Sequence, residues 1–186
     1  MKITEAGLGV LLFEPKAYGD DRGYFMETWR KEVYAEAGIK AEFVQDNISF
    51  SKKGVLRGLH YQHPQGQGKL VQVLSGRVYD AAVDIRRGSA TFGKWVGVEL
   101  SAEGHEQLYI PAGFAHGFCV LSEAAMFSYK CTDYYNGATE GGIIWNDPNV
   151  GIEWPIDGPS VSDKDAGLGL LRDVPAEKLP AMESET

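Results

Sequence analysis

The sequence predicts an all-β sandwich or barrel, and three observations carry that prediction. Ten short runs rich in Val, Ile, Leu, Tyr or Phe recur between turn residues. Glycine accounts for 23 of the 186 residues, well above its usual share of about 7%, which favours many turns over long helices. With 44% hydrophobic residues and no repeat or linker, the chain suits one packed domain over residues 1–186.

The expected strands are bounded by Gly, Pro, Ser or Asn, and they cover residues 8–14, 42–50, 54–61, 69–74, 76–86, 94–100, 106–111, 115–121, 125–132 and 142–146. A tight turn is expected at 74–77. The one convincing helix runs from Thr28 to Ala37, with Thr28 as its N-cap and Gly38 in the left-handed position after its end. The acidic tail, residues 173–186, is expected to be peripheral, either frayed or laid on the surface.

Charge is unevenly distributed along the chain. The net charge is −8, which disfavours binding to nucleic-acid phosphates as the main function. Residues 51–100 nevertheless carry eight basic and three acidic side chains. An electropositive centre in an acidic protein fits a small anionic ligand, although chance clustering explains the charge pattern equally well.

The two cysteines, Cys119 and Cys131, belong to no metal or redox spacing. We expect buried free thiols in a reducing compartment. The first residues lack the apolar core of a signal peptide, and no apolar run is long enough to span a bilayer. A soluble cytoplasmic protein is therefore expected.

Two polar stretches are candidates for ligand binding. Arg22 lies in the loop 21–27, and its guanidinium suits a phosphate or carboxylate, although a surface pair with a nearby acid is the simpler explanation. Gln45 and Asn47 share one face of an expected strand, with Asp46 on the other. If these amides face inward, they need polar partners, which a ligand could supply. An exposed polar strand face explains the pattern equally well.

A cationic cluster follows at residues 55–71. Arg57, His60 and Lys69 lie on neighbouring expected strands. Strict alternation places Arg57 and His60 on opposite faces, but a bulge at Gly58 would turn both inward. His60 could then act as a general base, and Lys69 could stabilise an oxyanion. The alternative, a purely structural histidine, does not explain why Arg57 and Lys69 lie close to it.

The stretch 109–118 brings His116 to the start of a strand through a tight turn. Tyr129 lies on the next expected strand, where a cavity tyrosine can donate a proton, although packing is the commoner role of a strand tyrosine. His60, His63 and His116 are the candidate metal ligands. The spacing of His60 and His63 is poor on a strand, and Lys69 nearby disfavours a cation, so no metal is expected.

Several of these stretches together resemble the dTDP-4-dehydrorhamnose 3,5-epimerase family, whose members have the cupin fold. The resemblance runs from about residue 2 to residue 172, and it rests on the segments 19–25, 43–47, 55–60, 68–71, 110–118 and 144–147. It implies a cupin-type jelly-roll β-barrel with one or two short helices. It also implies an epimerase of dTDP-rhamnose biosynthesis that acts on a nucleotide sugar and needs no cofactor, neither a metal nor a nicotinamide. Members of the family usually form homodimers with strand exchange.

The resemblance also implies roles for individual residues. His60 resembles the base that removes protons beside the ketone, and Asp165 the carboxylate that orients it. Lys69 is similar to the residue that stabilises the enolate, and Tyr129 to the acid on the opposite face. The positions that resemble substrate-binding residues, with Tyr18 as a stacking contact to the nucleotide ring and the arginines near the diphosphate, are Tyr18, Arg22, Glu27, Gln45, Asn47, Arg57, His116, Tyr135, Glu140 and Lys164.

Three other functions compete with a 3,5-epimerase. The first is a relative that inverts one centre or isomerises the ketone, which only the shape of the pocket separates from double epimerisation. The second is a metal-dependent cupin. The third is a non-catalytic sugar-binding module, which gives His60, Lys69, Tyr129 and Asp165 no joint task.

Overall fold

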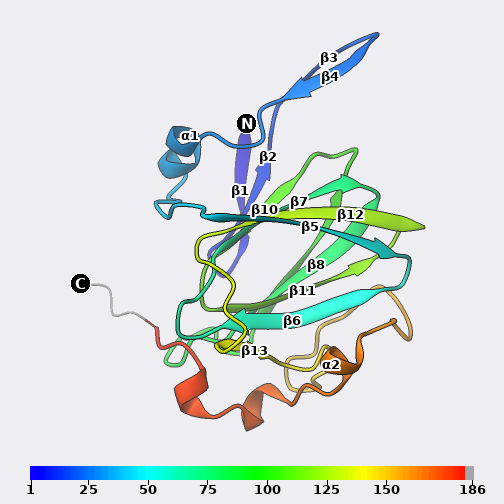
Figure 1. Cartoon of the computed structure of the whole chain (residues 1–186). Coiled ribbons are helices and arrows are strands. Elements are labelled where there is room, and N and C mark those ends of the chain that lie inside the picture. The colour runs from blue at the N-terminus through cyan, green and yellow to red at the C-terminus, as the bar shows by residue number, and fades with distance from the viewer. Residues whose placement is uncertain (183–186) are drawn as a thin grey trace.

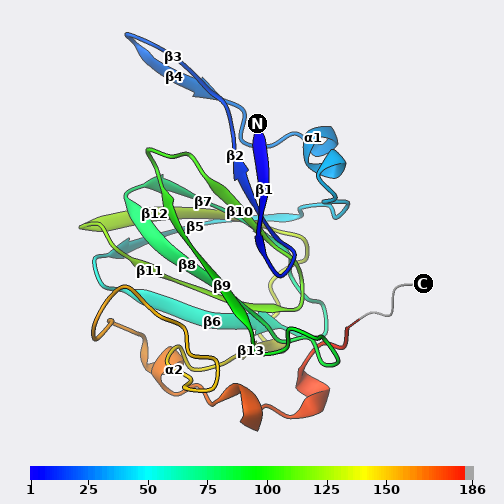
Figure 2. The same ribbon diagram turned by 180° about the vertical axis from the view of Figure 1, so that it is seen from behind.

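Two antiparallel sheets face each other across one interior in the computed structural model, which describes residues 1–182 (Figures 1 and 2). The six-stranded sheet has the order β1 (Lys2–Gly7), β2 (Val10–Glu14), β10 (Gln107–Ile110), β7 (Lys69–Ser75), β12 (Ala124–Cys131) and β5 (Gln45–Lys52). The five-stranded sheet has the order β13 (Glu140–Gly142), β6 (Leu56–Gln62), β11 (Phe114–Val120), β8 (Arg77–Asp84) and β9 (Trp95–Ser101). The all-β prediction is confirmed, and the arrangement is that of a cupin jelly roll.

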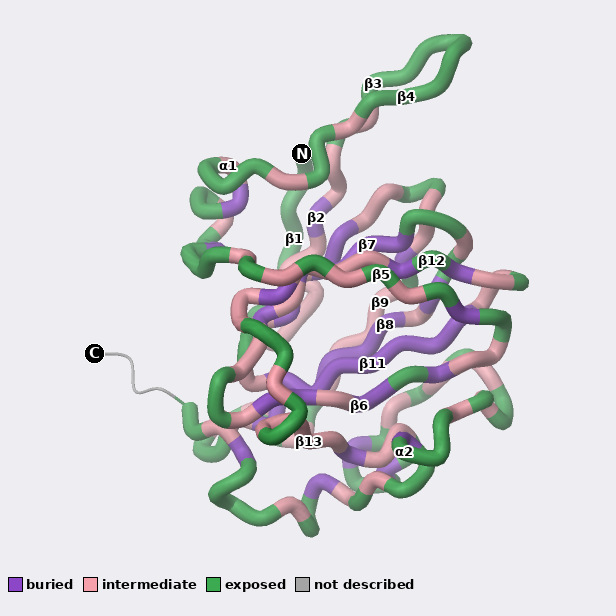
Figure 3. The backbone as a smooth tube through the Cα atoms, in the orientation of Figure 1, coloured by how far each residue is buried: buried purple, intermediate pink, exposed green. Residues whose placement is uncertain are grey.

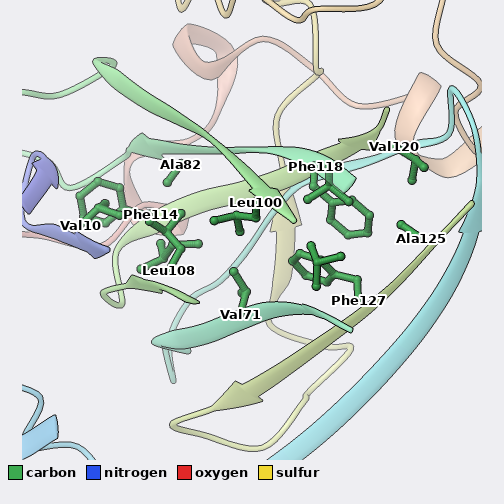
Figure 4. Packing of buried hydrophobic residues seen from close by; sticks show 13 residues of the cluster. Val10, Val71, Ala82, Leu100, Leu108, Phe114, Phe118, Val120, Ala125 and Phe127 are labelled. Carbon is green, nitrogen blue, oxygen red and sulfur yellow. The ribbon is translucent and has the colours of Figure 1, made fainter. Parts of the chain in front are cut away.

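The hydrophobic core fills one part of the space between the sheets. Val71 and Phe127 of the first sheet meet Leu100 and Phe118 of the second (Figure 4). The rings of Phe118 and Phe127 stack with their centroids 4.1 Å apart. The central strands β7, β8 and β11 are largely buried (Figure 3). In the edge strand β5, exposed residues alternate with half-buried ones and with buried Ser51.

The strands differ from the sequence prediction in three places. The run 8–14 is the second arm of a hairpin, because residues 7–9 form a left-handed turn that pairs β1 with β2. A second hairpin, β3 (Ala17–Asp20) with β4 (Gly23–Met26), was not predicted. The strand expected at 142–146 is wrong: β13 ends at Gly142, and a turn follows in which the Asp147 carboxylate accepts backbone N–H groups.

The predicted helix is shorter than expected. Helix α1 runs from Lys31 to Glu36 and has no side-chain cap, so the N-cap role predicted for Thr28 is wrong. The Thr28 carbonyl instead accepts hydrogen bonds from Tyr34 and Gln107, which fix the chain before the helix begins. Gly38 has φ of 95°, and the C-terminal cap predicted there is confirmed.

The chain after residue 150 wraps along the outside of the five-stranded sheet. It includes helix α2 (Asp163–Ala166) and two 3₁₀ turns, η1 (Leu171–Asp173) and η2 (Ala176–Lys178). Residues 173–182 are held by buried Leu179 and by backbone hydrogen bonds to Arg87. The rest of the predicted tail lies outside the described residues. No helix within residues 1–182 is long and apolar enough to cross a membrane.

The bulge predicted at Gly58 is confirmed, and it shapes the site described below. Between the pairs His60↔His116 and Arg57↔Phe118, β6 contains one residue more than β11. Gly58 has φ of 120°, and a Cβ atom there would lie 2.6 Å from Gly117 Cα. Only glycine therefore fits, since both the backbone conformation and the close approach exclude a side chain.

Replacing Gly58 by Ala should lower the free energy of unfolding by about 3 kcal/mol or more, because the backbone clash cannot relax through a side chain. Denaturant unfolding measures the change. Gly169→Ala is the matched control: its Cβ would meet nothing within 4 Å, so its stability should stay within about 1 kcal/mol of the wild-type value. Equal stability of the two variants would contradict the bulge geometry.

Candidate active site

Two adjoining cavities open between the sheets beside the hydrophobic core. We call the cavity lined by Gln45, Asn47, Tyr135 and Glu140 the outer cavity, with a volume of about 230 Å³. The cavity lined by Ser49, Arg57, His116 and Lys164 is called the inner cavity, with a volume of about 330 Å³. His60, Lys69 and Tyr129 line both cavities. These three side chains therefore mark the point at which the cavities meet.

His60 is held by a carboxylate from the far end of the chain. Its Nε2 lies 2.7 Å from Asp165 Oδ1, and Asp165 is itself buried. Because a carboxylate only accepts hydrogen bonds, Nε2 carries the hydrogen in the neutral ring and Nδ1 is the unprotonated nitrogen. Burial lowers the pKa of His60 and outweighs the opposing effect of Asp165, so the ring is a neutral base near neutral pH.

The bulge and helix α2 together place this pair. The backbone N–H of Gly58 donates to Asp165 Oδ2 at 3.2 Å. On the other side, Ser162 caps α2 by accepting a hydrogen bond from the Asp165 N–H at 3.1 Å. Asp165 is thus fixed through both its carboxylate and its backbone.

Lys69 and Tyr129 supply a cation and a hydroxyl at the same junction. Burial lowers the pKa of Lys69, while the nearby Cys131, Asp80 and Glu140 oppose that shift. Burial raises the pKa of Tyr129, so its hydroxyl keeps the proton at neutral pH. Within residues 1–182 neither side chain forms a hydrogen bond or an ion pair to the protein, which leaves both polar ends for a ligand.

A second histidine–carboxylate pair lies at the inner cavity, which His116 lines. His116 Nε2 lies 2.9 Å from Asp80 Oδ2 and 3.0 Å from Oδ1. Asp80 is fully buried, and burial raises the pKa of its carboxyl group. The sequence analysis missed Asp80, although an acidic residue inside the apolar run of β8 is a detectable signal because unpaired charges are rarely buried.

The amides predicted to share a face do so. Gln45 and Asn47 point toward the outer cavity, and Asp46 points outward to pair with Lys130. Gln45 Nε2 donates to Asn47 Oδ1 at 3.1 Å. Cys131 beside them is a buried free thiol, as predicted, and so is Cys119.

The mouth of the outer cavity carries an ionic and hydroxyl network. Glu140 Oε2 accepts hydrogen bonds from Lys164 Nζ at 2.7 Å and from the Tyr135 hydroxyl at 2.9 Å. The backbone N–H of Tyr135 donates to Gln45 Oε1 at 2.8 Å. Arg57 lines the inner cavity. In all, eleven of the fourteen predicted site residues line one or both cavities.

Tyr18, Arg22 and Glu27 are not brought to these cavities. Tyr18 and Arg22 lie on the β3–β4 hairpin, which projects from the end of the molecule opposite α2 (Figures 1 and 2). Arg22 pairs with Asp20 of the same hairpin, and Glu27 pairs with Arg30. In a single copy of the chain, none of the three lines the cavity that holds His60.

This arrangement suits proton transfer beside a carbonyl group. A neutral histidine with a fixed tautomer, a protonated tyrosine and a lysine ammonium line the same junction. A base, an acid and a cation are the groups that enolate chemistry needs.

Comparison with known proteins places the chain beside one family. The family model for dTDP-4-dehydrorhamnose 3,5-epimerase matches residues 6–173. The proteins of that name from Shigella flexneri and Pseudomonas aeruginosa are 61% and 56% identical, over 84% and 89% of this chain and 87% and 93% of theirs. The crystal structure of dTDP-6-deoxy-D-glucose-3,5-epimerase from Legionella pneumophila in complex with dTDP-4-keto-L-rhamnose aligns with a TM-score of 0.96 and 53% identity, covering 98% of this chain and 99% of that one.

The effect of Asp165 on His60 can be measured directly. Replacing Asp165 by Asn should lower the pKa of His60 further, because the hydrogen bond and the negative charge of the carboxylate favour the imidazolium form. Titration of the His60 ring protons by NMR measures this pKa. Asp163→Asn, a matched change at an exposed position of the same short helix, should leave it unchanged. A higher pKa in the Asp165 variant would contradict the pairing.

Proposed function

This chain belongs to the dTDP-4-dehydrorhamnose 3,5-epimerase family, and on that premise we propose how its own residues carry out the reaction. The substrate is dTDP-4-keto-6-deoxy-D-glucose and the product is dTDP-4-keto-L-rhamnose, an isomerisation in dTDP-rhamnose biosynthesis. The observation that carries the mechanism is the junction of the two cavities, where His60, paired with Asp165, lies with Lys69 and Tyr129.

His60 is the base. The hydrogens at C3 and C5 flank the C4 ketone, so removing either one gives an enolate rather than a localised carbanion. Nδ1 of the neutral ring takes the proton, and the resulting imidazolium is stabilised by the Asp165 carboxylate at 2.7 Å. The lowered pKa of His60 keeps the ring unprotonated before each step.

Lys69 stabilises the enolate oxygen. Its ammonium group has no protein partner within residues 1–182, so it is free to pair with the negative charge that develops on the substrate. Removal from water strengthens that attraction. The lysine therefore acts more strongly on the transition state than on the neutral ketone.

Tyr129 returns a proton to the opposite face of the sugar. Its raised pKa keeps the hydroxyl protonated until the enolate forms. Inversion needs a base and an acid on opposite sides of the carbon, and Tyr129 comes from the six-stranded sheet whereas His60 comes from the five-stranded one. The two sheets thus supply the two faces, and the reaction moves only protons, so it requires neither a metal nor a nicotinamide.

The nucleotide is held by the remaining predicted site residues. Gln45, Asn47, Tyr135 and Glu140 line the outer cavity, and Lys164, which lines the inner cavity, donates a hydrogen bond to Glu140. Arg57 and His116 line the inner cavity. Their mixture of amides, cations and an aromatic ring suits a nucleoside, a diphosphate and a sugar.

A second copy of the chain completes the binding site in this proposal. Tyr18, Arg22 and Glu27 lie outside the cavities of their own chain, so a homodimer in which the hairpin reaches the partner gives them a ligand to bind. The hairpin also exposes 72% of Phe25, and the outward face of β5 exposes 66% of Ile48. Exposed apolar side chains of this kind favour burial against another protein surface.

The cytoplasm is the proposed location, since nucleotide sugars are made and consumed there and the two thiols of the chain are free. We also propose that residues 1–186 form one domain.

Replacing His60 by Ala tests the mechanism. The variant should lower kcat for conversion of dTDP-4-keto-6-deoxyglucose by about 10²- to 10⁴-fold, the usual contribution of a general base. Its affinity for dTDP should stay within about threefold of wild type, since the base acts in the transition state. A coupled reductase assay measures turnover and calorimetry measures dTDP binding.

His63→Ala is the matched control, because His63 lies outside the two cavities that meet at His60 and its removal should leave kcat near the wild-type value. Loss of dTDP binding and of the folded state in His60→Ala would instead identify His60 as a structural residue.

A further inference from the structure

Two serines on the inward face of β5 have no part in the mechanism above. Ser49 and Ser51 follow Asn47 in the alternation of the strand, so all three point to the interior. Ser51 is buried, and Ser49 lines the inner cavity together with Arg57. This face of β5 is therefore polar along its whole length, although it lies between two packed sheets.

Ser51 holds Arg57. Its Oγ accepts a hydrogen bond from Arg57 Nε at 2.9 Å. That contact uses one of the five N–H donors of the guanidinium, and no carboxylate within residues 1–182 pairs with the other four. A guanidinium held at Nε presents its two terminal nitrogens as a fixed fork, the geometry that matches phosphate oxygens.

Ser49 has a hydroxyl without a partner. Its Oγ is shielded from water and forms no hydrogen bond within the described part of the chain. A buried polar group left in that state costs about 1–3 kcal/mol, and buried polar groups are rarely unpaired. Rotation about the Cα–Cβ bond moves the oxygen between staggered positions, and the residue borders the inner cavity, so an oxygen of a bound ligand can supply the missing partner.

We propose that Ser49 and Ser51 complete a diphosphate-binding subsite that Arg57 begins. Ser51 is a positioning residue that fixes the Arg57 fork, and Ser49 donates a hydrogen bond to a phosphate oxygen of the nucleotide sugar. The identity of the ligand rests on the proposed function, whereas the subsite itself rests on the contacts of these three side chains. Ligand binding thus explains why the inward face of β5 is polar, which apolar packing between the sheets does not.

Hydroxyl-deletion variants test the subsite. Ser49→Ala and Ser51→Ala should each weaken dTDP binding about 10- to 100-fold, which corresponds to the loss of one hydrogen bond to a charged group. Their affinity for thymidine, which lacks the phosphates, should not change. With saturating sugar nucleotide, kcat should stay within about twofold of wild type while KM rises, because the contact is made equally in the ground and transition states.

Ser75→Ala removes an exposed hydroxyl from β7 and is the matched control; its dTDP affinity should equal that of wild type. Unchanged dTDP affinity in both β5 variants would overturn the subsite. So would an equal loss of thymidine affinity, because the serines would then act on the nucleoside side or on the fold. If the wild-type protein neither binds dTDP nor converts the sugar nucleotide, the proposed function fails and the ligand assignment fails with it. If the wild type is fully active and both serine variants bind dTDP as tightly as it does, only the serine assignment is overturned.

Discussion

The contact between His60 Nε2 and Asp165 Oδ1 joins two segments 105 residues apart in the chain, and the geometry of the site depends on it. His60 faces the cavity because the bulge at Gly58 shifts the alternation of β6. Asp165 meets it because α2 is capped by Ser162 and lies beside β6, where the carboxylate reaches the same cavity. The Gly58 N–H donates to the other carboxylate oxygen of Asp165, so the bulge and the helix fix one another.

The interior between the sheets is divided between apolar packing and polar function. Around Val71 and Leu100 it is filled by side chains in contact, whereas around Lys69 it is hollow and lined largely by polar groups. Burying charged groups is unfavourable unless they are paired. Carboxylate partners meet that cost at His60 and His116. Lys69 has no hydrogen-bond or ion-pair partner in the described part of the chain, residues 1–182, so in the proposed mechanism it can neutralise the developing charge of the substrate.

The sequence predicted the fold class and most strands because alternation and turn residues are local signals. It also predicted the bulge, since strict alternation puts Arg57 and His60 on opposite faces of the strand and a bulge at the intervening Gly58 lets both reach the same face. It failed where long-range contacts decide. Thr28 looks like a helix cap, but its carbonyl is used by Gln107 from another strand. Asp80 of β8 pairs with His116 of the adjacent strand β11; the apolar run around Asp80 marks it as unusual, but no local signal identifies its partner.

The same limit applies to the candidate site. His60, Lys69 and Tyr129 could be selected from local pattern together with chemistry, whereas Asp165 was found only through the family resemblance. The positions of Tyr18, Arg22 and Glu27 outside the cavities of their own chain could not be predicted, because they depend on the three-dimensional path of residues 17–27, which include the projecting β3–β4 hairpin (Figure 1).

Solvent exchange tests the central claim that one base and one acid act on both carbons beside the ketone. The protein is incubated with dTDP-4-keto-6-deoxyglucose in D₂O, the product is trapped by a reductase, and deuterium at C3 and C5 is read by NMR or mass spectrometry. The account predicts deuterium at both carbons together with inverted configuration at both. Deuterium at one carbon only, or none while the substrate remains bound, would contradict it.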